Sequence, residues 1–179
     1  MKMFVLTMSM VLLAVFDAGG EHSGRAIPSI NNLIAKNAGE PGGAKGFDET
    51  ADAALATMKK RAAELKITGV GVVAYAEGDT IQSWTSKMVV MGRMKEAPST
   101  GNNGFNLLGI AYAKSAEMAD TLQNSGSATR PPMAGEVGWQ GGAIAHAKTG
   151  YVIAAFSGGK SEEDLEVSKA GLEVLKGAL

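Results

Sequence analysis

Two apolar segments of strand length near the C-terminus, 139–147 and 151–157, constrain the fold more than any other feature of the sequence. Only Lys148–Gly150 separates them, and a connection this short requires the two strands to be antiparallel neighbours. Glycine tolerates the positive φ of a tight turn, so we expect a β-hairpin that turns at Gly150. Ser157-Gly158-Gly159 ends the second segment, and an acidic segment follows. The chain is therefore predicted to end in a hairpin, a glycine elbow and a helix that packs against the sheet.

The last helix has a recognisable start and a clear apolar face. Ser161 is its expected N-cap, and Asp164, three positions later, is the expected acidic partner in a capping box. One face repeats every three or four residues, as a buried helical face does. Its members are Leu165, Ser168, Leu172, Leu175 and Leu179.

Upstream, a helix is predicted from the N-cap Asp48 to about Lys66, because small and apolar residues recur at helical spacing. They are Ala51, Ala54, Leu55, Met58, Ala62 and Leu65. The period then changes to that of strands. The segment 68–76 is rich in valine, 80–86 alternates apolar and polar residues, and 87–94 either continues that strand or pairs separately.

A second helix is predicted over Phe105–Ser125, with Gly126 as the glycine that ends it. Leu108, Ala111, Ser115, Met118 and Leu122 form its buried face. The segment 126–137, which contains tandem prolines, is expected to be an ordered irregular loop. Helices before, between and after antiparallel strands are typical of a layered α+β domain, here with a central antiparallel sheet of about five strands covered by helices.

The first 46 residues read differently from the rest. Met1–Met3 carries a lysine and precedes an apolar run from Phe4 to Phe16, which is typical of a secretory signal peptide and too short for a membrane span. We therefore assign 1–18 as a signal peptide, 19–46 as an arm rich in Gly, Asn and Pro, and 47–179 as the domain. The expected location is secreted or periplasmic. If the apolar run is instead a buried strand, the expected location is cytoplasmic.

Composition excludes several partners. The formal net charge of −1 leaves no electrostatic footprint for nucleic acid, and no stable membrane span is expected. The absence of cysteine rules out disulfides and thiolate-bound metals. A hydrophobic fraction of 45% is enough for a packed core. The chain is therefore predicted to be a globular protein.

The order of these elements resembles a known family. An Ala-rich basic helix, a valine strand turning at Gly78, a middle helix, Gly141-Gly142 before an apolar strand, and Ser157-Gly158-Gly159 before an acidic helix are similar to the GlcG-like, HbpS-type haem-binding proteins. The resemblance covers roughly 48–179 and implies a profilin-like fold, assembly into oligomers, and haem as a candidate cofactor. The chain lacks the family's Val-Asp-x-x-Gly turn, having Ala74–Gly78 there, and no family ligand maps onto a matching residue.

The loop that leads into the final hairpin is the expected wall of a ligand pocket. Arg130 offers a guanidinium for a carboxylate or propionate, and Trp139 an indole for a flat ligand. The full candidate set is Arg130, Trp139, Gly141, Gly142 and His146. The competing interpretation is that this loop forms an interface or is purely structural. For His146, the competing interpretation is an exposed strand residue without a function.

The glycine elbow is a second candidate site, for an anion. Backbone amides of Ser157, Gly158, Gly159 and Ser161 at a helix start are suited to a negatively charged group. A phosphate-binding loop is excluded because Ala154 stands where that motif needs glycine. A helix start that is simply capped explains the same residues. No metal site is predicted, and the methionines at 88, 91 and 94 are interpreted as packing residues.

Three functions stay open at this stage. The first is a small-ligand-binding oligomer, with haem or another tetrapyrrole as a candidate ligand. The second is an enzyme or accessory protein acting on a small carboxylate such as a 2-hydroxy acid, using Arg130 and the glycine elbow. The third is a structural oligomer without a ligand. No catalytic residue is assigned, because no nucleophile with a partner base is apparent.

Overall fold

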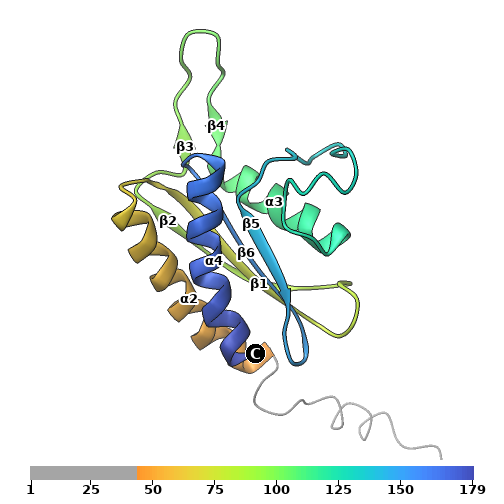
Figure 1. Cartoon of the computed structure of the whole chain (residues 1–179). Coiled ribbons are helices and arrows are strands. Elements are labelled where there is room, and N and C mark those ends of the chain that lie inside the picture. Colours follow the sequence, from red (N-terminus) through yellow and green to blue (C-terminus); the bar gives the residue numbers. More distant parts are fainter. Residues whose placement is uncertain (1–43) are drawn as a thin grey trace, which may run out of the picture. The chain divides into compact units, whose positions relative to one another are not determined.

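The computed structural model describes residues 44–179, and this part of the chain is an α+β domain (Figure 1). Its helices are α2 (Ala44–Glu64), α3 (Leu107–Thr121) and α4 (Ser161–Ala178). Four strands form an antiparallel sheet in the order β2 (Thr85–Met91), β1 (Gly69–Glu77), β6 (Gly150–Ser157) and β5 (Gly142–His146). Two short strands, β3 (Lys95–Glu96) and β4 (Phe105–Asn106), pair separately at the base of a projecting hairpin.

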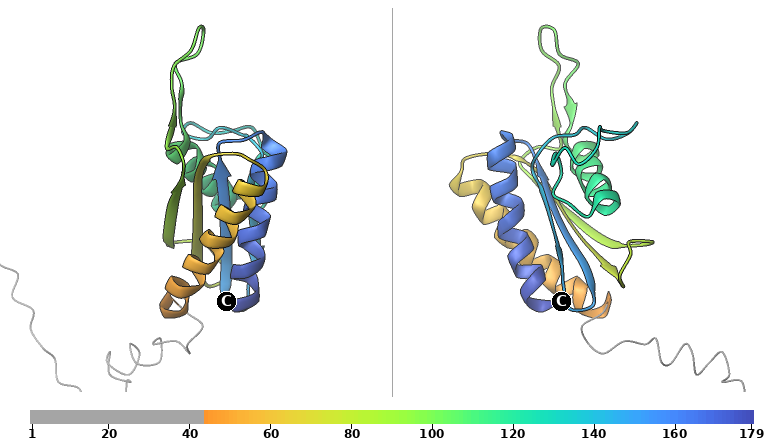
Figure 2. Two further views of the ribbon diagram at one scale, coloured as in Figure 1. Left: turned by 90° about the vertical axis from the view of Figure 1, so that its left-hand side faces the viewer. Right: turned by 45° about the vertical axis from the view of Figure 1, so that its right-hand side comes forward.

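Helices cover both faces of the sheet (Figure 2). Side chains alternate across strand β1, as the strand period requires. Val73 and Tyr75 join the core beneath α2 and α4, whereas Val72 and Ala74 join the cores beneath α3. The predicted antiparallel sheet between helices is confirmed. The finer profilin-like assignment stays a prediction.

The predicted strand count was wrong in one place. The central sheet has four strands, and the alternating segment 80–86 is mostly loop. Its apolar members Ile81 and Trp84 pack against the α3 side of the core. The partner of β1 is Thr85–Met91, so the run assigned to 87–94 supplies the strand. The apolar residues of this segment thus contact the core from a loop rather than from a strand.

Three helix ends also differ from prediction. Asp48 lies inside α2 and does not cap it, although the predicted buried face of that helix is confirmed. Helix α3 ends at Thr121, where Leu122 takes the left-handed conformation with φ 53° in place of Gly126. Helix α4 is capped by Lys160, whose amide donates to Glu163 Oε2 at 2.8 Å, so Ser161 is the first helical residue.

The final hairpin is present as predicted, but Gly150 is needed for a different reason. Its φ is not positive, and it is the first residue of β6. A Cβ at this position would overlap the carbonyl oxygen of Ala76, because β1 passes closely there. The positive φ of 93° belongs to Gly78 at the end of β1, whose amide donates to the Thr149 carbonyl.

The assignments of 1–18 and 19–46 lie outside the described residues, apart from the first turn of α2. Within 44–179, none of the helices combines the length and the apolar character that crossing a membrane demands.

Candidate functional site

A buried ion pair joins α3 to α4 at the upper end of the sheet. Lys114 Nζ lies 2.8 Å from Asp164 Oδ2, and the two side chains are only 1% and 5% exposed. Lys114 also donates to the carbonyl oxygen of Phe156 at 2.8 Å, and Asp164 Oδ1 accepts from the Gly159 amide at 2.8 Å. Burial lowers the pKa of Lys114 and raises that of Asp164, while the attraction between the two charges opposes both shifts.

Glycine at position 141 permits this pair to form. Gly141 has φ 128°, and a Cβ there would overlap Lys114 Nζ and Asp164 Cβ. Its carbonyl oxygen accepts from the Ser168 hydroxyl at 2.7 Å, which ties the start of β5 to α4. The backbone at Gly141 therefore lies close to the ion pair, and the hydrogen bond from Ser168 holds it there.

A small cavity of about 150 Å³ opens beside the pair, and we call it the α4 cavity. Lys114 and Asp164 line it together with the elbow that precedes α4. Phe105 and Trp139 form an aromatic wall, with ring centroids 5.6 Å apart in an edge-to-face arrangement. Trp139 is 45% exposed, so the indole lies between the cavity and solvent.

The polar lining of the α4 cavity combines the ammonium group of Lys114 and two serine hydroxyls with the carboxylates of Asp164 and Glu96. An ammonium group has three N–H donors, and two of those of Lys114 are taken by Asp164 and Phe156. Ser157 and Ser161 add hydroxyl groups to the lining. Glu96 on β3 also lines the cavity, but it is exposed, so water screens its charge. Acceptor oxygens of a ligand can use the third N–H of Lys114 and the two hydroxyls.

The structure divides the residues predicted for the two sites. Trp139 and the elbow residues come together in the α4 cavity; these are Ser157, Gly158, Gly159 and Ser161. Gly141 does not line that cavity, but the absence of a side chain at this position leaves room for the ion pair that does. Gly142 opens β5, where it packs on Met118 and donates to Ser125 Oγ. Arg130 lines a separate cavity of about 400 Å³.

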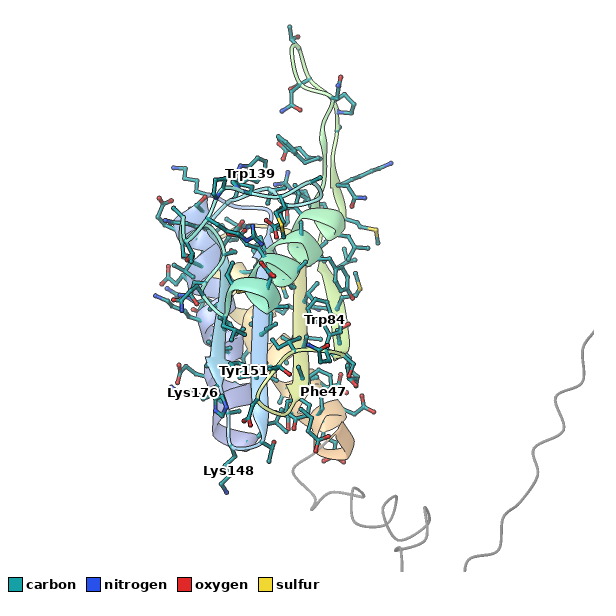
Figure 3. The ribbon with its side chains drawn as sticks, turned by 90° about the vertical axis from the view of Figure 1, so that its right-hand side faces the viewer. Phe47, Trp84, Trp139, Lys148, Tyr151 and Lys176 are labelled. Carbon is teal, nitrogen blue, oxygen red and sulfur yellow. The ribbon has the colours of Figure 1, made fainter. Side chains whose placement is uncertain are left out.

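His146 lies away from the α4 cavity. It is exposed at the end of β5, with its ring 4.9 Å from that of Tyr151 in an edge-to-face contact. Figure 3 shows Tyr151 and Lys148 at the hairpin end of the sheet and Trp139 at the opposite end. His146 and Trp139 therefore do not face a common ligand within one subunit.

Part of the predicted anion site is already used by the chain itself. The amides of Gly159 and Lys160 donate to Asp164 and Glu163, each at 2.8 Å. The chain's own carboxylates thus take the position that an anion would occupy at these two donors. The serine hydroxyls and the spare donor of Lys114 remain for a ligand, and the anion site itself stays a prediction.

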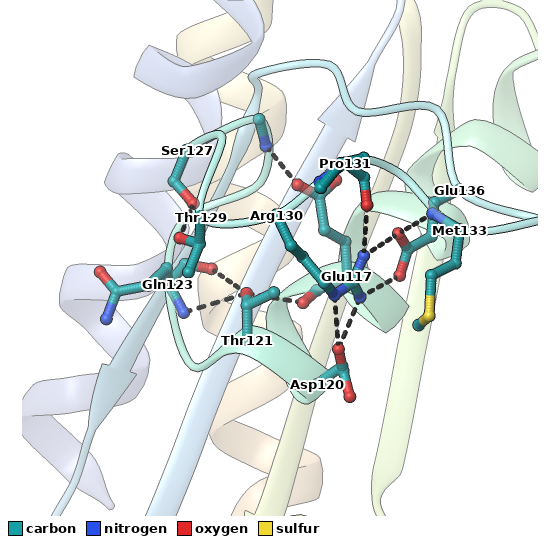
Figure 4. Close-up of polar contacts among 11 residues, drawn as sticks. Glu117, Asp120, Thr121, Gln123, Ser127, Thr129, Arg130, Pro131, Met133 and Glu136 are labelled. Atoms are coloured by element: carbon teal, nitrogen blue, oxygen red, sulfur yellow. Dashed lines mark hydrogen bonds and ion pairs between the residues drawn. The ribbon is translucent and has the colours of Figure 1, made fainter.

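Arg130 is part of a rigid polar network in the loop after α3 (Figure 4). Its guanidinium donates to Asp120 Oδ2, to both oxygens of Glu136 and to the Pro131 carbonyl oxygen. The guanidinium and the Met133 amide hold the pKa of Glu136 at about 2, well below its usual range. Arg130 organises the irregular loop and has no N–H group left for a ligand carboxylate.

The residues predicted for haem binding do not line one common cavity. The α4 cavity of about 150 Å³ is smaller than the 300–1,000 Å³ that is usual for small-molecule pockets, and a tetrapyrrole needs more. The imidazole that would serve as an axial ligand, His146, lines neither this cavity nor that of Arg130. These residues therefore do not line one common cavity, and haem binding stays a prediction.

Sequence reasoning missed the charged residues that define the site. Lys114 and Glu117 lie on the buried side of α3 with Ile110, Ala111 and Met118. Their spacing in the sequence could have predicted their burial, because both positions fall on the helical face that the buried apolar residues of α3 define. Asp164 was noticed, but as a cap rather than as the partner of a lysine 50 residues earlier in the chain.

The comparisons with known proteins give no assignment: neither the protein-family models nor the curated proteins include a match to this chain. The resemblance to GlcG-like proteins therefore stays a prediction.

Proposed function

We propose that this protein binds a small organic acid, of the size of a 2-hydroxy acid, in the α4 cavity. The observation that carries the proposal is the buried ammonium group of Lys114, which lines the cavity and has one N–H donor beyond those given to Asp164 and Phe156. Binding rather than turnover is proposed, because neither serine hydroxyl of the lining is hydrogen-bonded to a base among residues 44–179.

Cavity size supports a ligand of this class. A water molecule takes up ~30 Å³ of liquid, so a cavity of about 150 Å³ holds about five groups of that size. A two- or three-carbon hydroxy acid has a comparable number of non-hydrogen atoms. The ligand's oxygens would accept from Lys114 and from the hydroxyls of Ser157 and Ser161, with its carbon atoms against Ile110 and the Trp139 ring.

Tryptophan fluorescence tests this proposal directly. The Trp84→Phe variant leaves Trp139 as its single indole, and glycolate or lactate should change its emission saturably. The neutral analogue glycolamide should bind at least about tenfold more weakly, because a hydrogen bond between charged groups is stronger than one between neutral groups. The Trp139→Phe variant, which reports on Trp84 alone, should show no response.

Two substitutions test whether the ligand binds in the α4 cavity. Ser157→Ala removes one donor and should weaken glycolate binding by several-fold, whereas Ser127→Ala, outside this cavity, should not. Ile110→Phe fills the cavity and should abolish binding, since it alters volume without touching the ion pair. Equal affinity for glycolate and glycolamide, or full binding in Ile110→Phe, would refute the assignment.

Haem is a second candidate ligand, now at the protein surface rather than in the α4 cavity. The specific observation is the exposed imidazole of His146, a side chain that can serve as an axial ligand of haem iron. Titration with hemin should then produce a Soret band that is lost in His146→Ala and retained in Lys148→Ala. If neither hemin nor glycolate binds, the remaining function is that of a structural oligomer.

We also propose a homo-oligomer. The hairpin between β3 and β4 projects from the domain and leaves its tip without contact to the sheet (Figures 1 and 2). Val90 on the edge strand β2 and Met94 at the hairpin base are 37% and 46% exposed. The projecting β3–β4 hairpin lies next to exposed apolar side chains and the edge strand β2. These features suit contact with a second copy of this chain.

A further inference from the structure

The cavity lined by Arg130 contains a buried carboxylate with a free oxygen. We call this space, of about 400 Å³, the Glu117 cavity. Glu117 is only 7% exposed, and its Oε1 accepts from the Gly126 amide at 2.8 Å. Its Oε2 is buried and has no hydrogen-bond partner among residues 44–179. A buried acceptor without a donor is unfavourable, so this oxygen is a position where a donor group would be bound.

The surrounding residues cannot supply that donor. The guanidinium of Arg130 is the nearest cationic group in the network of Figure 4, and its N–H groups go to Asp120, Glu136 and Pro131. The hydroxyl of Thr129, which also lines the cavity, is hydrogen-bonded to Ser127 Oγ at 2.9 Å. Among the described residues, Glu117 Oε2 therefore has no side-chain donor, whereas Arg130 beside it is fully engaged.

Charge in this region favours a cation over a neutral donor. Glu117, Asp120 and Glu136 are three carboxylates around the single guanidinium of Arg130. The region is thus short of positive charge, and the burial of Glu117 makes its carboxylate interact more strongly with a cation than it would in water. The remaining lining is apolar, including Pro131, Pro132 and Ala128, and suits a short alkyl chain.

We propose that the Glu117 cavity binds the ammonium group of a small aliphatic primary amine. One N–H of the ammonium group donates to Glu117 Oε2, and the alkyl chain packs against the rings of Pro131 and Pro132. The loop is held in place before the ligand arrives, because Arg130 is tied to both α3 and the segment that carries Glu136. This site is independent of the proposed acid site, since the two cavities share no lining residue.

Calorimetric titration of the full chain with propylammonium chloride tests the proposal. Saturable binding is expected, with a dissociation constant on the order of millimolar for so small a ligand. Tetramethylammonium carries the same charge but has no N–H group, and propanol has a donor but no charge. Both should bind at least about tenfold more weakly if hydrogen bonding and charge each contribute.

A matched pair of variants identifies the carboxylate. Glu117→Gln keeps an oxygen for the Gly126 amide but replaces the free acceptor and its charge, and should weaken propylammonium binding at least about tenfold. Glu173→Gln, an exposed site on α4 with the same change in net charge, should leave binding unchanged. Glycolate should not compete with propylammonium.

Three results would overturn the proposal. They are the absence of saturable propylammonium binding, equal binding of tetramethylammonium, and unchanged affinity in Glu117→Gln. The first would mean that the cavity holds only water. The comparison of propylammonium with tetramethylammonium needs no substitution, so it decides the question even if the Glu117 variant does not fold.

Discussion

Two charged residues one turn apart on α3, Lys114 and Glu117, are buried for different reasons. Lys114 is matched by Asp164, so its charge is compensated within the chain. Glu117 has a backbone partner for one oxygen only. A buried charge is stabilised by an ion pair or by a bound ligand: Lys114 has its ion pair, and we propose that Glu117 binds an ammonium group. Each marks one of the two proposed sites.

At the same scale, Glu136 predicts how stability depends on pH. Its folded pKa of about 2 lies below the ordinary value of 4.5, so its ion pair with Arg130 stabilises the fold above pH 4.5. This stabilisation should be lost progressively as the pH falls from about 4.5 to about 2. Thermal melts should show Glu136→Gln less stable than the parent at pH 7 and equal to it near pH 2.

Glu173→Gln serves as the control for that measurement, since Glu173 is exposed and has no ion pair among the described residues. The same gap between Glu136→Gln and the parent at every pH would contradict an ionised Glu136 as the source of the effect.

At the scale of elements, the pairing of α2 with α4 depends on glycine at position 171. A Cβ there would come within 2.6 Å of Met58 Cγ and Sδ, and Met58 is fully buried. Gly171→Ala should therefore lower the free energy of unfolding by about 1–3 kcal/mol through overpacking. Urea denaturation measures this change.

Gly177 on the same helix provides the comparison. Nothing lies within 4 Å of a Cβ placed there, so Gly177→Ala should be neutral or should stabilise by up to about 1 kcal/mol through helix propensity. If both alanines changed stability equally, close packing of the two helices would not be what position 171 requires.

At the scale of the whole molecule, the projecting hairpin predicts the state of association. Size-exclusion chromatography with light scattering should show the full chain larger than a monomer. Val90→Glu combined with Met94→Glu should shift it to the monomer, because charges would be buried in the apolar contact. Leu122→Glu, with a similar exposure of 38% at the end of α3, should not. A monomeric parent at every concentration would refute the oligomer.

The sequence by itself determined the elements whose signals are local. Helical spacing specified the buried faces of α2 and α4, and a short connection between two apolar segments specified the final hairpin, because both patterns follow from the period of a single element. The position of the second strand was not determined. Ile81 and Trp84 lie in a segment that was predicted to be a strand, but they pack from a loop on the core cluster that includes Met118 of α3. Which contact an apolar residue makes depends on elements distant in the chain.

Only the tertiary structure decided the candidate sites. Trp139 and the elbow at 157–161 were selected from the sequence, and they do meet in one cavity. Arg130 and His146 were selected for the same pocket and lie elsewhere. Lys114 meets Asp164 across 50 residues, at a point that Gly141 leaves open. The way the helices pack on the sheet determines which charges pair over 50 residues of sequence, and no local sequence pattern encodes that packing.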